Sequence, residues 1–184
     1  MRLEYYPPPN RSETPLSQDL PYRRSAGIAL INANADVFVG RRKKERDASL
    51  LVGHEWQMPQ GGIDDGESPL EAATRELFEE TNISSVSFIA EAPDWLSYDL
   101  PAGANGRFRG RYRGQTQKWF LFRFHGKESE INIDRPASGN HAAEFQAWRW
   151  ERWEALPDLV VPFKRAVYEK VVAVFAPIAR AHRV

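Results

Sequence analysis

The sequence predicts an α+β fold in which a mixed β-sheet lies between helices, an α/β/α arrangement. Segments with strand character outnumber helical segments, and the two expected helices do not alternate with the strands as they would in a doubly wound fold. The length of 184 residues and the apolar content of 42% suit one globular domain with its own hydrophobic core.

The composition excludes several classes of protein. The chain has no cysteine, so disulfide frameworks and thiolate nucleophiles are ruled out. The apolar stretch 171–179 is far shorter than the ~20 residues of a transmembrane helix, and the first residues lack the apolar block of a secretion signal. We therefore expect a cytoplasmic protein with no membrane partner. The 25 basic and 25 acidic residues balance, and we expect no DNA partner.

Residues 1–20 are rich in proline and polar side chains, so we expect a tail, mobile or packed on the surface, before a domain of residues 21–180. Strands are expected where aromatic and β-branched residues concentrate, at residues 27–31, 37–39, 86–91, 95–98, 118–124 and 145–150. The first two should form a hairpin. Apolar residues at helical spacing predict a helix over 162–175.

The other predicted helix, residues 69–81, has the clearest sequence signals for its two ends. Ser68 precedes Pro69, and Glu71 follows three residues after the serine, which is the pattern of a capping box. Asn82 tolerates the left-handed conformation that ends many helices. At about 100° per residue, one side of this helix is expected to face the core through Leu70, Ala73, Thr74 and Leu77.

The opposite side of this helix presents a cluster of carboxylates. Glu76, Glu79 and Glu80 fall within an arc of about 100°. Like charges at these spacings repel by roughly a few tenths of a kcal/mol per pair, so helix stability alone would not select them. Carboxylate oxygens are the ligands that hard cations such as Mg²⁺ prefer. The sequence therefore predicts a metal-binding helix.

A glycine-rich loop, Gly61 to Glu67, leads into this helix. Its glycines are expected to allow positive φ and a close backbone approach to a metal ion or phosphate, and Glu67 is expected to pair with Arg75. The chain resembles the Nudix hydrolase family over residues 22–176, because the signature spacing of that family is matched by Gly61, Glu67, Arg75-Glu76-Leu77, Glu79-Glu80 and Ile83. Asn82 stands where the signature has its last glycine.

Further segments resemble the RNA 5′-pyrophosphohydrolase and diadenosine polyphosphate hydrolase branch of that family, namely residues 56–62, 114–120, 144–150 and 163–168. The resemblance implies a metal-dependent hydrolase of phosphoanhydride bonds, which removes pyrophosphate from 5′-triphosphorylated RNA and leaves a 5′-monophosphate, a step of RNA decay. The alternative is a dinucleoside polyphosphate hydrolase that converts diadenosine tetraphosphate to ATP and AMP. The sequence does not choose between an RNA 5′ end and a dinucleotide.

The resemblance also assigns the residues that handle metal and water. Divalent cations, about two or three Mg²⁺ ions with Mn²⁺ as an alternative, would be held by Glu76, Glu79, Glu80, Glu144 and the carbonyl of Gly61. A glutamate would accept the proton of the attacking water, and Glu79 is favoured over Glu80 and Glu144. The residues Gly62, Glu67 and Arg75 would maintain the structure of the motif.

The remaining matched positions would contact the substrate. The phosphate path is matched by Arg23, Arg42, Gln115 and Lys118, and positions near the nucleobase are matched by Tyr98, Phe163 and Lys164. For Tyr98 and Phe163, core packing and base stacking are equally good interpretations. Strand alternation places Lys118 on the face opposite Trp119, and the lysine should point outward if the tryptophan is buried.

One basic segment has two equally good interpretations at the level of sequence. The segment 105–114 interleaves arginine, glycine and aromatic residues, and it either guides an RNA chain or forms a solvated hairpin tip. We expect Trp119, Trp148 and Trp150 to pack in the core or on a sheet face rather than to stack on bases. A domain that binds nucleotides without hydrolysing them is the other functional class, but every glutamate of the signature is present. No protein activator can be identified.

Overall fold

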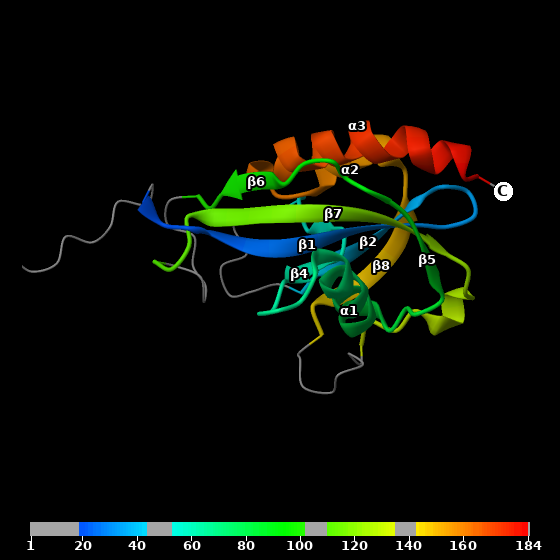
Figure 1. Ribbon diagram of the computed structural model, residues 1–184. Helices are drawn as coiled ribbons and strands as arrows, with labels where there is room; N and C mark the ends of the chain where they lie inside the picture. Colours follow the sequence, from blue (N-terminus) through cyan, green and yellow to red (C-terminus); the bar gives the residue numbers. More distant parts are fainter. Residues whose placement is uncertain (1–18, 44–52, 102–109, 135–142, 184) are drawn as a thin grey trace, which may run out of the picture.

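The computed structural model describes residues 19–43, 53–101, 110–134 and 143–183. Along these residues the strands and helices are β1 (Tyr22–Ile31), β2 (Val37–Arg42), β3 (Trp56–Gln57), β4 (Gln60–Gly62), α1 (Pro69–Thr81), β5 (Val86–Glu91), β6 (Leu96–Asp99), β7 (Gly114–Phe124), β8 (Phe145–Glu151), α2 (Leu156–Leu159) and α3 (Arg165–Ala181). Figure 1 shows α3 along one face of the sheet and α1 against the other. This arrangement confirms the predicted α/β/α class.

Strands β1 and β7 form the parallel centre of the sheet, in register from Tyr22 opposite Gly114 to Ile31 opposite Arg123. The strand order is β3-β2-β1-β7-β5, while β4 pairs with β1, β6 with β7 and β8 with β2. Every pairing other than β1 with β7 is antiparallel. The edge of β1 that does not pair with β7 has two partners: β4 pairs near the middle of β1, and β2 pairs with the last residue of β1. Strand β4 also lies beside α1.

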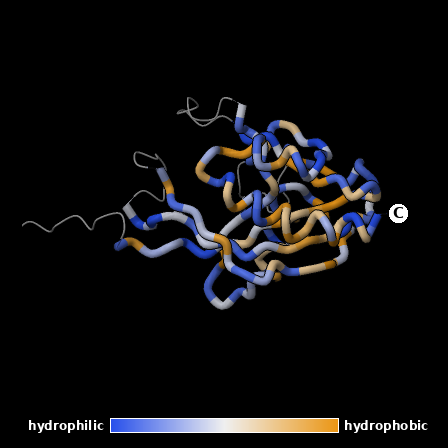
Figure 2. Tube along the Cα trace, turned by 90° about the horizontal axis from the view of Figure 1, so that it is seen from above, coloured by the Kyte–Doolittle hydropathy of each residue, from blue (hydrophilic) through white to orange (hydrophobic). Residues whose placement is uncertain are grey.

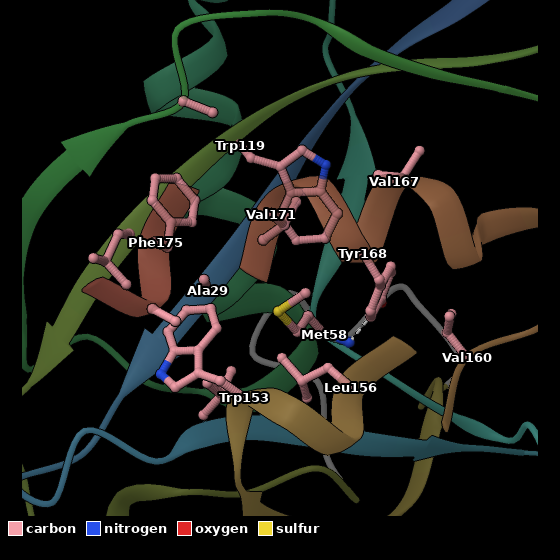
Figure 3. Packing of buried hydrophobic residues seen from close by; sticks show 14 of the residues in the cluster. Ala29, Met58, Trp119, Trp153, Leu156, Val160, Val167, Tyr168, Val171 and Phe175 are labelled. Atoms are coloured by element: carbon pink, nitrogen blue, oxygen red, sulfur yellow. Dashed lines mark hydrogen bonds between the residues drawn. The ribbon is translucent and has the colours of Figure 1, made fainter. Parts of the chain in front are cut away.

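Each face of the sheet carries an apolar cluster. On the α3 side, Trp119 of β7 packs edge-to-face against Tyr168 of α3, with ring centroids 5.7 Å apart, and Figure 3 shows Phe175 and Val171 beside them. On the α1 side, Leu77 packs in a cluster with Phe120. Burying a side chain of this size stabilises the fold by about 1.5–3 kcal/mol.

The three tryptophans lie where the sequence predicts. Trp119 is fully buried. Trp148 stacks on Phe38 at a centroid distance of 5.7 Å, and Trp150 meets the same ring edge-on at 6.0 Å. All three therefore pack in the core or on a sheet face, as expected.

Polar residues concentrate at one end of the sheet. Figure 2 shows the end farthest from the C-terminus as mostly blue to white, whereas orange gathers over the rest of the molecule. This end contains the starts of β1 and β7, whose sequences Tyr-Arg-Arg-Ser and Gly-Gln-Thr-Gln-Lys are polar. Among the described residues, none of the helices combines the length and hydropathy that crossing a membrane requires.

The predicted helix 69–81 is confirmed residue for residue, and its ends have the predicted chemistry. The Ser68 side chain accepts a hydrogen bond from the Glu71 N–H while Glu71 bonds back to the Ser68 N–H, and Asn82 ends the helix at φ 61°. The predicted facing is wrong in part, because Leu70 and Thr74 are exposed.

The buried arc of α1 consists of Ala72, Ala73, Leu77, Glu80 and Thr81. Helix α1 packs against both β1 and β4. That placement turns Glu80 toward the sheet, so this carboxylate does not lie on an outward face with its neighbours.

Most predicted strands are confirmed, with different ends. Strand β1 begins five residues earlier than expected and β7 four residues earlier, because their polar starts pair with each other. The short strands β3 and β4 and the short helix α2 were not predicted. The C-terminal helix begins at Arg165, after a 3₁₀ turn over Pro162–Lys164, and continues to Ala181. The predicted tail lies outside the described residues, apart from residues 19 and 20.

Candidate functional site

The loop before α1 is fixed to the helix by Arg75. Its Nε and Nη2 donate to the two carboxylate oxygens of Glu67, each at 2.8 Å, and Nη2 also donates to the Gly62 carbonyl at 2.8 Å. This bidentate contact lowers the pKa of Glu67 and raises that of Arg75. The ion pair expected from the sequence is therefore confirmed.

The two glycines that open this loop are needed for space. Their φ angles are not positive, contrary to expectation, and Gly66 is the glycine of the loop with φ at 82°. A Cβ on Gly61 would lie 1.8 Å from the carboxyl carbon of Glu76, and a Cβ on Gly62 would lie 2.0 Å from Nη2 of Arg23. Absent side chains thus let one carboxylate and one guanidinium lie directly against β4.

Three carboxylates share one environment on this side of β4. Glu80 is 7% exposed and accepts a hydrogen bond from the Gln60 N–H at 3.3 Å. Burial, with the negative charges of Glu144 and Glu76, raises the pKa of Glu80 well above its ordinary value. Burial also raises the pKa of Glu76, although Arg75 opposes the shift. Glu144 reaches this cluster from the residue preceding β8, as the sequence predicts.

Glu79 lies at the edge of the cluster. Nη1 of Arg75 donates to Glu76 at 2.9 Å and to Glu79 at 3.2 Å, so both carboxylates are held by the same guanidinium. In the described part of the chain, no three histidine or acidic side chains already surround one point at ligand distance. The donors are all oxygen, however, and the mutual repulsion of Glu76, Glu80 and Glu144 is what a bound hard cation would relieve.

A row of polar side chains lies on the α3 face of the sheet. Tyr98 of β6, Gln115 of β7 and Arg23 of β1 are in register on three adjacent strands. The ring of Tyr98 lies 5.5 Å from that of Phe163, tilted by 42°, and Phe163 is half-buried. Four residues predicted to contact substrate are thus brought together.

Lys164 lies beneath this row and is 5% exposed. Its Nζ lies 5.3 Å from the centre of the Tyr98 ring and 3.4 Å from Oε1 of Gln57. Burial and the nearby charge of Arg42 lower the pKa of Lys164 to about 7, against the attraction of Glu144 and Glu80. Arg42, at the end of β2, therefore also belongs to the site, next to the strand that Glu144 precedes.

Lys118 does not join these residues. Strand alternation places it on the face opposite Gln115, and it is 8% exposed, contrary to the expected outward orientation. Its Nζ pairs with Glu91 at 2.7 Å and donates to the Pro93 carbonyl at 3.1 Å. The cation is buried because β5 and the chain after it supply both partners.

The basic segment 105–114 is described only from Gly110 onward. In that part, Arg113 makes a bidentate contact with Asp99, with Nε donating to Oδ1 at 3.0 Å and Nη2 to Oδ2 at 2.8 Å, and lies over the ring of Tyr22. Arg113 therefore ties β6 to β7 and has an acidic partner. The proposed guidance of RNA by the rest of this segment falls outside the described residues.

Sequence reasoning missed three glutamines of the site. Gln57 and Gln117 are buried, and Gln60 joins β4 to Glu80. The available signal was strand alternation, which puts Gln117 between Gln115 and Trp119 on one face, where a buried polar side chain needs partners.

The fold and the site together define a class, an α+β protein with an acidic helix on one side of a short strand and a cationic, aromatic surface on the other. The NUDIX domain model matches residues 21–171, and the chain belongs to the Nudix family.

Two curated relatives are similar over most of the chain. The RNA pyrophosphohydrolase of Agrobacterium fabrum is 59% identical over 161 residues, covering 86% of this chain and 94% of the relative. The RNA pyrophosphohydrolase of Mesorhizobium japonicum is 56% identical over 165 residues, covering 89% and 95%.

Solved structures share the fold at low identity. A binary complex of the C. elegans Ap4A hydrolase has a TM-score of 0.57 and 19% identity, covering 84% of this chain and 98% of that one. The E. coli dihydroneopterin triphosphate pyrophosphohydrolase has a TM-score of 0.57 and 20% identity, covering 83% and 98%. At these identities the likeness concerns the fold alone.

Proposed function

We propose that this Nudix hydrolase removes pyrophosphate from the 5′ end of triphosphorylated RNA and leaves a 5′-monophosphate. The observation that supports this most strongly is the 59% identity to a relative named RNA pyrophosphohydrolase over 94% of that relative's length. Such a substrate would place the enzyme in the cytoplasm.

Divalent cations, Mg²⁺ or Mn²⁺, would be held by oxygen donors on the α1 side of β4, namely Glu76, Glu79, Glu80, Glu144 and the carbonyl of Gly61. The support is the chemistry of the donor set and the repulsion within it. When bound, such ions supply positive charge that offsets the charge of the phosphoanhydride oxygens. Arg75 would then keep its bonds to Glu67 while releasing the other carboxylates.

The substrate would extend over β4 from the carboxylates to the α3 face. Arg23, Arg42 and Gln115 would donate hydrogen bonds to phosphate oxygens. Phe163, which is half-buried, would offer aromatic surface to the first base. Tyr98 is only 6% exposed, so it would support the Phe163 ring from the core side, with Lys164 beside it. We leave Lys118 out of the substrate path because Glu91 already neutralises it.

Glu79 would accept the proton of the attacking water. Its side chain is 22% exposed, more than that of Glu76 at 15%, so a water molecule can reach it. Glu80 is a weaker candidate for this general base because it is buried against the Gln60 N–H. Glu144 is the third candidate for the same role.

The test compares kcat/KM for a triphosphorylated RNA and for diadenosine tetraphosphate with Mg²⁺ present. We expect the RNA to be the better substrate and the products to be pyrophosphate and a 5′-monophosphorylated RNA. A clear preference for the dinucleotide would overturn the proposal in favour of the alternative hydrolase.

A further inference from the structure

A group of amides lies on the α3 face at the start of β7. In the register of the sheet, Gln117 lies opposite Ser25 of β1 and Leu96 of β6, and Gln115 lies one row earlier. Gln60 of β4 lies opposite Gly27, one row later. Gln117 therefore sits between the other two glutamines.

The side-chain amide of Gln117 donates two hydrogen bonds to other glutamines. Its Nε2 donates to Oε1 of Gln60 at 2.8 Å and to Oε1 of Gln115 at 3.4 Å. Oε1 of Gln115 also accepts from the Ser25 hydroxyl at 3.3 Å. The reverse orientation of the Gln117 amide would place its oxygen against two carbonyl oxygens, so these neighbours fix the orientation.

This arrangement has a cost. Gln117 is completely buried, and within the described residues its own Oε1 has no hydrogen-bond partner. A buried acceptor without a partner is unfavourable, and an apolar side chain of the same shape would avoid the penalty. Stability alone does not explain a glutamine here.

The unpaired oxygen of Gln117 is explained by the orientation that Gln117 imposes on the side-chain amides of Gln60 and Gln115. Because both turn their oxygens to Gln117, their N–H₂ groups point away from it. The Gln60 side chain lies next to Tyr98 and lowers the pKa of its hydroxyl, against the larger effect of burial. Gln115 lies between Tyr98 and Arg23 and is half-buried, and its Oε1 is already occupied by Gln117 and Ser25, so its N–H₂ group is the end left for a substrate.

We propose that Gln117 is a positioning residue that fixes the amide of Gln115 so that its N–H donors, and not its carbonyl oxygen, face the phosphate chain, while the bond to Gln60 holds Gln117 itself in place. The inference rests on the proposed function of the same site. Phosphate oxygens accept hydrogen bonds, so a reversed amide at Gln115 would repel the substrate.

The experiment compares Gln117→Met, which removes both donated bonds with little change of volume, with Gln117→Glu, which offers only acceptors when ionised. The matched control is Thr116→Val, on the opposite face of the same strand, where the threonine bonds Ser97 at 2.9 Å. We expect Gln117→Met to raise KM for triphosphorylated RNA roughly tenfold with kcat nearly unchanged, as for uniform binding. Gln117→Glu should raise KM further, and Thr116→Val should leave it unchanged.

Two further measurements separate this role from a structural one. In a Gln115→Met background, Gln117→Met should add much less to KM than it does alone, because it acts through Gln115. In the free protein, NMR side-chain amide signals of Gln60 and Gln115 should shift in Gln117→Met and stay in place in Thr116→Val.

Unshifted amide signals in Gln117→Met would overturn the inference whatever the substrate is. Equal changes of KM in Gln117→Met and Thr116→Val would also overturn it. So would additive changes of KM when positions 115 and 117 are both replaced. If instead the amide signals shift while the wild-type protein does not hydrolyse triphosphorylated RNA, the proposed function fails and the positioning role stands.

Discussion

Replacing Glu67 by glutamine tests how the loop is held to α1. The Glu67 side chain is 15% exposed and that of Arg75 is 29% exposed, so the bidentate pair is largely shielded from water. A hydrogen bond to a charged group contributes about 1.5–3 kcal/mol. Arg75 keeps its other partners in the variant, so we expect a net loss of roughly 1–2 kcal/mol. At about 2–4 °C per kcal/mol for a chain of this size, Tm should fall by about 2–8 °C.

The effect should depend on pH in a defined direction. Because Arg75 lowers the pKa of Glu67, the pair stabilises the fold above the unfolded value of about 4.3, and the contribution is lost as pH falls through the lowered folded value. Thermal unfolding in buffer without divalent ions should therefore separate wild type from Glu67→Gln at pH 7, and the two curves should converge in acid. The control is Glu169→Gln, which removes the exposed pair with Arg165 and should change Tm little. Equal Tm values at pH 7, or a difference that persists in acid, would refute the reasoning.

Three other substitutions test the site. Gly61→Ala should lower turnover at least ~10-fold with the far-UV circular dichroism unchanged, because the added methyl displaces the Glu76 carboxylate; normal turnover would contradict the close packing. Glu79→Gln should keep its Tm and lose at least ~100-fold in kcat, the usual effect of losing a general base, and near-normal kcat at saturating Mg²⁺ would exclude that role. Lys164 loses its charge as pH rises through about 7, so the wild-type kcat/KM for triphosphorylated RNA should fall on the alkaline side. Lys164→Met should have lower kcat/KM without this alkaline decline, and an unchanged pH profile would argue against a charged lysine in binding.

Features that depend on neighbours in sequence could be predicted without coordinates. The ends of α1 follow from Ser68, Glu71 and Asn82, which act within one helical turn. The contact between Glu67 and Arg75 also follows from spacing, since Glu67 immediately precedes the N-cap Ser68 and Arg75 lies in the second turn of α1. The signature and the resemblance it carries lead directly to the family and to the glutamates of the site.

The burial and the partners of single side chains could not be predicted from local sequence, because they depend on which strands become neighbours. Glu80 is buried because β4, which is only three residues long, pairs with β1 beside α1. Lys118 is neutralised by Glu91, and Gln117 bonds Gln60 from a distance of 57 residues along the chain.

Residue types and their spacing were therefore enough to indicate the family, the acidic helix α1 and the kinds of side chain in the candidate site. Which of these side chains are buried, paired or accessible became visible only in the folded chain. The physical reason is that burial and pairing depend on contacts between segments far apart in sequence, and those contacts form only when the sheet assembles.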